Sequence, residues 1–344
     1  MALDIPRSTT LPRLPEASIP RPGPLVVGGL EIFPPVLQAP MSSLTTLPVR
    51  TLAEEHGCGL TITEWLPADA LAAGVKSAEK KLRASVAGRA FGVQLFGRDP
   101  KTIARAAAMG AEIGAAIVDL NMGCPGKRVR SGGTGAALML EPELAAELVA
   151  AAIEGVSGRA EVTVKMRAGW DRRSLNAPEF ASRLVAAGAR MITVHGRTRQ
   201  ERYRGKVELA IIRRVKEAVD VPVVANGDII DLASMVKAFE ETSADAVMVG
   251  RAALGNPWIF AELAAFWRGS LPVPPDDATR VSMYLRHLGL HREAIDDERR
   301  AVFELRKFAR WYLFGVADEA RLRREINRLE DVSAVRELLE AFLR

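Results

Sequence analysis

Eight short, almost continuously apolar runs recur between residues 36 and 251, and longer stretches with helical spacing separate them. The runs begin at residues 36, 60, 91, 116, 161, 191, 221 and 245. Such runs are typical of strands covered on both faces, and the segment 141–156, with Leu144, Leu148 and Ala152, follows the helical period. Eight strand–helix alternations over roughly 235 residues predict an α/β fold, a (β/α)8 TIM barrel.

An open, doubly wound parallel sheet is the alternative for the same pattern. Sheets of that kind carry a glycine fingerprint after the first strand. Here the sequence PMSSLTT, starting at residue 40, follows the first apolar run. The barrel is therefore the preferred prediction.

Three regions of the chain differ in composition. Residues 1–24 hold six of the 20 prolines, which is typical of an extended or disordered arm. After about residue 262 the strand-like runs stop, and residues 276–344 place Leu, Phe and Trp at intervals of three and four. We expect a proline-rich arm over 1–28, a barrel over 29–262 and an all-α helical domain over 263–344.

Composition excludes several classes of protein. The chain of 344 residues is 48% apolar and 26% charged, as in ordinary globular proteins. Its net charge of +5 suits a polyanionic partner without requiring one. Two cysteines are too few for a disulfide framework or a zinc site. With no signal-peptide core and no membrane-length apolar run, we expect a cytoplasmic protein without a metal.

Polar side chains end most of the eight runs. They are Glu64, Gln94, Asn121, Lys165, His195, Asn226 and Arg251. Chemistry in a barrel gathers at the carboxyl ends of the strands, so we expect these side chains to share one site, although each alone could be a helix cap. Lys165 is the least suited to that ordinary role, because an ammonium at the top of a barrel needs an anionic neighbour or ligand.

Glycines follow the seventh and eighth runs, in ANGDI from residue 225 and VGRAALGNP from residue 249. This is the usual phosphate position of a barrel, where backbone N–H groups face an anion. Gly227, Gly250 and Arg251 are therefore candidate phosphate ligands. Amide side chains opposite a lysine suit the donor and acceptor edge of a flavin. FMN is therefore the favoured ligand, and a sugar phosphate remains the alternative.

The two cysteines have different surroundings. Cys124 lies among turn residues and a basic cluster, in NMGCPGKRVRSGG, whereas Cys58 precedes the second run as a small buried residue would. An ordinary thiol, with a pKa of about 8.5, is protonated at neutral pH and can act as a general acid if a loop holds it at the substrate.

Taken together, these motifs resemble those of the tRNA-dihydrouridine synthases, and most closely the bacterial B-type branch. The resemblance covers roughly residues 29–340. The matching segments are QAPM (38–41), QLFG (94–97), LNMGCP (120–125), GKRVR (126–130), VKMRAGWD (164–171), VHGRTRQERYRG (194–205), ANGDI (225–229), VGRAALGNPWIF (249–260) and RRAVFELRKFARWYLFG (299–315).

The resemblance implies an FMN enzyme that reduces the C5–C6 bond of particular uridines in tRNA, with NADPH as reductant. The flavin passes a hydride to C6, and Cys124 gives a proton to C5. Implied cofactor contacts are Pro40, Met41, Gln94, Asn121, Lys165, His195, Asn226, Gly227, Asp228, Gly250 and Arg251. Implied contacts with tRNA, in its D-loop region, are Lys127, Arg128, Arg197, Arg199, Arg306, Lys307 and Arg310. We expect a monomer without a protein partner.

Three positions depart from the family pattern. Ser43 and Thr46 stand where the family usually has glycine and aspartate, and Phe308 replaces the histidine of an Arg-Lys-His motif. The first loop and one RNA contact are therefore expected to differ. Two other functions stay open: a flavin barrel acting on a small pyrimidine or enone, and a non-catalytic RNA-binding protein.

Overall fold

Eight parallel strands close into a barrel in the computed structural model, which describes residues 13–14, 19, 21–83, 88–126, 132–295 and 297–344. Each strand pairs with the next around the ring, and β4 pairs with β6 on the side where the short strand β5 (Leu66–Pro67) branches off. The barrel strands are β3 (Val36–Gln38), β4 (Leu60–Ile62), β6 (Phe91–Phe96), β7 (Ile117–Met122), β8 (Glu161–Arg167), β9 (Ile192–His195), β10 (Val223–Asn226) and β11 (Ala246–Val249). The predicted TIM barrel and its eight strands are confirmed.

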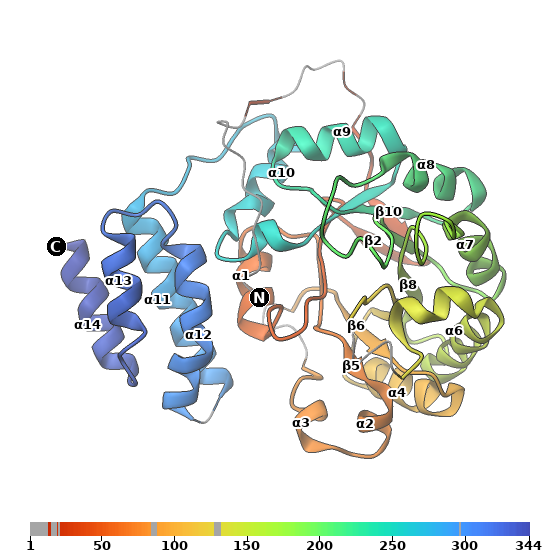
Figure 1. Ribbon diagram of the computed structural model, residues 1–344, viewed down its shortest axis with the longest axis horizontal. Coiled ribbons are helices and arrows are strands. Elements are labelled where there is room, and N and C mark those ends of the chain that lie inside the picture. The colour runs from red at the N-terminus through yellow and green to blue at the C-terminus, as the bar shows by residue number, and fades with distance from the viewer. Residues whose placement is uncertain (1–12, 15–18, 20, 84–87, 127–131, 296) are drawn as a thin grey trace.

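Helices cover the outside of the barrel (Figure 1). They are α1 (Leu47–Glu55), α2 (Ala68–Ala72), α3 (Lys76–Glu79), α4 (Pro100–Glu112), α6 (Pro142–Val156), α7 (Ala177–Ala186), α8 (Leu209–Ala218), α9 (Leu232–Thr242) and α10 (Trp258–Arg268), with the 3-10 turns η1 (Gly135–Leu140) and η2 (Arg251–Ala253). Local signals set several starts. Asp99 caps α4 ahead of Pro100, and Asp231 and Ser234 form a capping box on α9.

A hairpin closes the amino-terminal end of the barrel. Strands β1 (Leu25–Val27) and β2 (Leu30–Ile32) pair antiparallel. Their side chains Leu25, Val27 and Ile32 pack in one buried cluster with barrel residues that include Leu37 and Met248. The predicted boundary of the arm at residue 28 therefore falls inside the hairpin. With this end filled by apolar side chains, polar groups are left to the opposite end.

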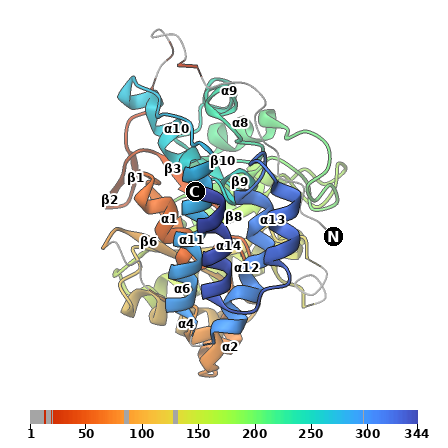
Figure 2. The ribbon, with the colours of Figure 1, turned by 90° about the vertical axis from the view of Figure 1, so that its left-hand side faces the viewer.

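Four helices stand beside the barrel, and Figure 2 shows them in front of it. They are α11 (Asp277–Ala294), α12 (Glu298–Tyr312), α13 (Glu319–Ile326) and α14 (Val332–Leu343). Helix α10 carries the predicted boundary at residue 262, and its Leu263 and Phe266 pack in the barrel's core. The division into a catalytic domain and a tRNA-binding domain stays a prediction.

The barrel and the four helices share a core. Leu44, Leu52 and Leu254 of the barrel cluster with buried side chains of α11 and α12. Gly255 has a positive φ of 62°, and a Cβ added there would lie 2.6 Å from the backbone carbon of Trp311 and 2.7 Å from the backbone nitrogen of Tyr312. The loop after β11 therefore lies directly against the backbone of α12.

Two negative findings concern the described residues alone. None of their helices is both long and apolar enough to span a membrane. No three of their His, Cys, Asp and Glu side chains are grouped as metal ligands would be.

Gly255→Ala is expected to lower the free energy of unfolding by about 3 kcal/mol, because the new Cβ meets helix backbone and the backbone conformation is left-handed. Urea unfolding followed by circular dichroism measures the loss. Gly269→Ala is the control, since Gly269 also has a positive φ, of 74°, but no described residue lies within 4 Å of its added Cβ. We expect a loss of about 1 kcal/mol there, and equal losses in both variants would contradict the proposed backbone contact.

Candidate functional site

Four neighbouring strands bring the predicted polar residues together at the carboxyl end of the barrel. In the register of the sheet, Asn121 of β7 is paired with Lys165 of β8, and Arg167 of β8 with His195 of β9. Gln94 of β6 is paired with Asp119 of β7. These side chains share the inner face of the barrel because residues two apart on a strand point the same way.

Hydrogen bonds link buried side chains below this end of the barrel. The Asp119 carboxylate accepts from Gln94 Nε2 and from Thr163 Oγ1, each at 2.7 Å. Gln94 Oε1 accepts from Asn121 Nδ2 at 2.9 Å. Gln94, Asp119 and Thr163 are each 0% exposed. Burial raises the pKa of Asp119 to about 6, against the lowering effect of the Gln94 and Thr163 hydrogen bonds.

Cys124 lies on the loop that follows β7, where its side chain is half-buried. Asn121 Oδ1 accepts from the backbone N–H of Gly123 at 3.2 Å and of Cys124 at 2.9 Å. Arg167 Nε donates to the Gly123 carbonyl at 2.7 Å. The loop is thus held from both β7 and β8. Cys58, by contrast, is fully buried, and its thiol donates to the Leu60 carbonyl.

The open end of the barrel is strongly cationic. Burial and, next in size, the charge of Arg167 lower the pKa of Lys165 to about 8, against the opposing effects of Asp119 and Cys124. Lys165 has no hydrogen-bond acceptor among the described residues, whereas Arg167 donates to the carbonyls of Thr198 and Arg202. Lys165 is therefore a cation placed for an anionic partner.

His195 is an uncharged imidazole in this setting. Burial, and then the charges of Arg167, Lys165, Arg197 and Arg251, hold its pKa well below the ordinary value. Its Nε2 lies 3.4 Å from a guanidinium nitrogen of Arg197. Because a guanidinium can only donate, that contact assigns the imidazole proton to Nδ1.

Arg197 is built into the loop after β9. It is 2% exposed and donates to both carboxylate oxygens of Asp228 and to the carbonyls of Arg204 and Gly205. Asp228 in turn lies 3.5 Å from Arg251. Arg197 was predicted to contact tRNA. Its guanidinium group is buried, and its N–H donors already bond to Asp228 and to carbonyls of this loop, so the side chain lies in the interior and not at the surface.

The two predicted phosphate turns lie side by side after β10 and β11. Gly227 has a φ of 114°, and an added Cβ would come within 2.7 Å of the His195 ring. Among the described residues, a Cβ on Gly250 would meet only Ala39, at 4.0 Å. The first glycine is required for packing on His195, and the second leaves the backbone open to a ligand. Asn226 Nδ2 donates to the Met248 carbonyl and so stabilises the strand ends.

The loop after β3 is held between the barrel and α12. The N–H of Ser43 donates to Glu64 Oε2 at 2.8 Å, and the Ser43 carbonyl accepts from Lys307 Nζ at 2.6 Å. Ser43 has a φ of 57°, a conformation that favours the glycine usual in the family. Met41, a predicted cofactor contact that follows Pro40, starts this loop. Lys307 therefore contacts the loop itself, in addition to any role with RNA.

The other predicted RNA contacts are distributed over two regions. Arg199 stacks on Trp170, with 4.5 Å from the guanidinium carbon to the ring centroid. On α12, Arg306 donates to the Leu329 carbonyl and stacks on Phe303, and Arg310 lies over Trp311. Lys127 and Arg128 lie outside the described residues.

Three residues of this site were not predicted from the sequence. Asp119 and Arg167 lie two positions from Asn121 and Lys165 on the same strands, so the period of two could have found them. Tyr203 is 49% exposed, and its ring centroid is 5.6 Å from the guanidinium carbon of Arg167 and 5.3 Å from that of Arg251. Tyr203 lies within the matching segment VHGRTRQERYRG (194–205), but no role of its own was predicted for it from the sequence.

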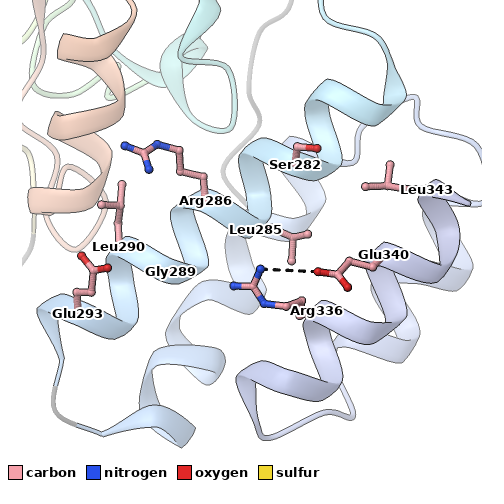
Figure 3. A pocket seen from close by; sticks show the side chains of 9 residues that line it. All are labelled: Ser282, Leu285, Arg286, Gly289, Leu290, Glu293, Arg336, Glu340 and Leu343. Atoms are coloured by element: carbon pink, nitrogen blue, oxygen red, sulfur yellow. Dashed lines mark ion pairs between the residues drawn. The ribbon is translucent and has the colours of Figure 1, made fainter.

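A cavity of about 470 Å³ lies between α11 and α14 (Figure 3). Its charged lining includes Arg336, which pairs with Glu340, and Arg286, which pairs with Glu55 at the end of α1. Because α1 runs antiparallel to the strands, Glu55 lies toward the closed end of the barrel. This cavity is therefore separate from the strand ends.

Comparison with known proteins decides the family. The family model described as Dihydrouridine synthase (Dus) matches residues 37–344. The chain belongs to the dihydrouridine synthase family. This membership confirms the resemblance found in the sequence motifs.

Relatives match over most of their length. A "Probable tRNA-dihydrouridine synthase" of Rhodobacter capsulatus is 40% identical over 91% of this chain and 95% of its own. A protein of Rickettsia bellii with the same description is 38% identical over 92% of this chain and 97% of its own. The "tRNA-dihydrouridine synthase B" of Xanthomonas axonopodis pv. citri is 37% identical over 90% of this chain and 92% of its own. The solved structure of a nitroalkane oxidase from Streptomyces ansochromogenes matches over 90% of this chain and 95% of its own, at 16% identity and a TM-score of 0.41.

Proposed function

We propose that this chain reduces specific uridines of tRNA to 5,6-dihydrouridine, with FMN as cofactor and NADPH as reductant. One observation carries the proposal: a half-buried cysteine is held by its backbone beside a cationic barrel end whose lysine has no acceptor among the described residues. Membership of the family supports the reaction. We further propose that the protein acts in the cytoplasm as a monomer.

The described residues fit an anionic flavin. Lys165 presents an ammonium without an acceptor within the described ranges, and Gly250 leaves its backbone open beside Arg251. His195 offers a neutral imidazole with its proton on Nδ1. Pro40, Met41, Asn121, Asn226, Gly227 and Asp228 complete the proposed contacts, and Gln94 contributes through its hydrogen bond to Asn121.

Cys124 has the role of proton donor in this proposal. When bound and reduced by NADPH, FMN would supply the hydride that C6 of the uridine accepts. Cys124 Sγ gives its proton to C5, so that the C5–C6 double bond becomes single, and solvent restores the thiol. The N–H groups of Gly123 and Cys124 fix the loop through Asn121, which keeps the sulfur at the substrate.

The basic residues of the loops and of α12 supply the proposed RNA contacts. Arg199, Arg306, Lys307 and Arg310, with Lys127 and Arg128, are proposed to meet phosphates of the D-loop region. Such contacts position the RNA and make its affinity depend on salt. The uridine must leave the folded tRNA to reach the end of the barrel.

The direct test uses tRNA that lacks the modification. The purified protein is incubated with it and NADPH, and dihydrouridine is measured position by position. Product at one or a few D-loop uridines supports the proposal. The opposite outcome is a protein that carries FMN, oxidises NADPH and reduces free uracil or a small enone, yet makes no dihydrouridine in any tRNA. That result would overturn the proposed function.

Cys124→Ala is expected to lower the rate of dihydrouridine formation by at least about 100-fold, the range of general acid catalysis. FMN content and tRNA affinity should stay at their wild-type values, since only the donor is removed. Cys58→Ala is the control, because Cys58 is fully buried away from the site. Undiminished turnover by Cys124→Ala would refute the role of proton donor.

The affinity for FMN should fall as pH rises above about 8. Burial lowers the Lys165 pKa to about 8, so the free protein holds its ammonium below that pH and loses it above. A charge-assisted contact contributes about 1.5–3 kcal/mol, or about 10–100-fold in affinity. Flavin fluorescence titrations from pH 7 to 10 measure the effect. Lys165→Met should bind weakly and show no such dependence; an identical pH profile in both proteins would contradict the assignment.

A further inference from the structure

Asp119 lies outside every role assigned so far, yet it begins a chain of hydrogen bonds that ends at the Cys124 loop. The links run from Asp119 Oδ2 to Gln94 Nε2, from Gln94 Oε1 to Asn121 Nδ2, and from Asn121 Oδ1 to the loop N–H groups. Their lengths are 2.7, 2.9 and 2.9 Å, with a further bond of 3.2 Å to Gly123 N.

The chain has only one consistent direction. A carboxylate accepts and does not donate, so the Gln94 amide must turn its NH2 group toward Asp119 and its oxygen toward Asn121. Asn121 must then turn its own NH2 group toward Gln94 and its oxygen toward the loop. The reversed orientation would place the Asn121 NH2 group against the backbone donors of Gly123 and Cys124.

We propose that Asp119 is a positioning residue that fixes the orientation of two amides in series and thereby holds the loop that carries Cys124. Gln94 and Asp119 are each 0% exposed and Asn121 is 9% exposed, so water does not readily replace a lost link. The inference rests on the proposed function where it assigns Cys124 a role in proton transfer. The orientation of the loop itself does not depend on that role.

Asp119→Leu and Asp119→Asn separate orientation from mere burial. Leu removes the acceptor and leaves the Gln94 amide without a fixed direction. Asn can turn its oxygen to Gln94 and its NH2 group to Thr163, whose hydroxyl accepts as well as donates. The first variant should loosen the loop, and the second should keep it.

Thr163→Val is the matched control. Thr163 donates to the other carboxylate oxygen of Asp119 at 2.7 Å and is also 0% exposed. Its replacement removes a buried hydrogen bond from the same carboxylate but leaves the amide chain intact. A general weakening of the core would affect Thr163→Val and Asp119→Leu alike, whereas loss of amide orientation affects only Asp119→Leu.

The readouts are hydrogen exchange of the segment 121–126 and the rate at which iodoacetamide alkylates Cys124, both at pH 8 without FMN or RNA. Cys58 is 0% exposed and is the internal control for unfolding. We expect Asp119→Leu to exchange and alkylate about tenfold faster, as loss of about one hydrogen bond predicts. Asp119→Asn and Thr163→Val should stay within about twofold of the wild type.

Wild-type loop behaviour in Asp119→Leu, or equal loosening in Thr163→Val, would overturn the inference. If Asp119→Leu does not fold, Gln94→Leu breaks the middle link and should loosen the loop to the same extent; an unchanged loop in that variant also overturns the inference. In dihydrouridine assays, Asp119→Leu should lower kcat about tenfold with KM for tRNA unchanged. A wild-type protein that makes no dihydrouridine would refute the proposed function and leave the loop measurements decisive on their own.

Discussion

Closure of the parallel barrel is the constraint on which the site depends. All eight strands run in one direction, so their carboxyl ends meet at one rim, and the β1–β2 hairpin fills the other end with apolar side chains. Gln94, Asn121, Lys165 and His195 come from strands that are consecutive around the ring. Their convergence needs no loop rearrangement, because the sheet register pairs Asn121 with Lys165 and sets Gln94 and His195 beside Asp119 and Arg167 of the neighbouring strands.

The rim also concentrates positive charge, and the few acidic groups have separate tasks. Asp228 neutralises Arg197 and lies near Arg251, whereas Asp119 is enclosed by Gln94 and Thr163. Neither carboxylate bonds to Lys165. Burial, and then the surplus positive charge, lower the pKa of His195 and keep it neutral. Lys165 is left as a cation without an acceptor among the described residues. Unpaired buried positive charge is electrostatically unfavourable, which is the physical reason why the proposed anionic cofactor would stabilise this site.

Much of this could be predicted from the sequence. The eight strands follow from uninterrupted apolar runs, and the site at the rim follows from the polar residues that end them. Asp119 was not predicted, because it lies inside the apolar run, two positions before the strand-end residue Asn121 and on the same face. The interior position of Arg197 depends on Asp228 and on a loop whose course no local pattern specifies. The same holds for Ser43 and Lys307, which are 264 residues apart.

The contact between Ser43 and Lys307 joins the two parts of the proposed mechanism. Lys307 comes from the helix that is proposed to meet RNA, and its ammonium has three donors, of which one faces the Ser43 carbonyl. Glu64 fixes the other side of the same residue from the barrel. The loop that starts at Met41 therefore has one support from each part of the molecule. Gly255 also lies directly against the backbone of α12, so the helical bundle packs on the loop that follows β11. RNA docked on α12 would thus meet a site whose first loop is already ordered by the same helix.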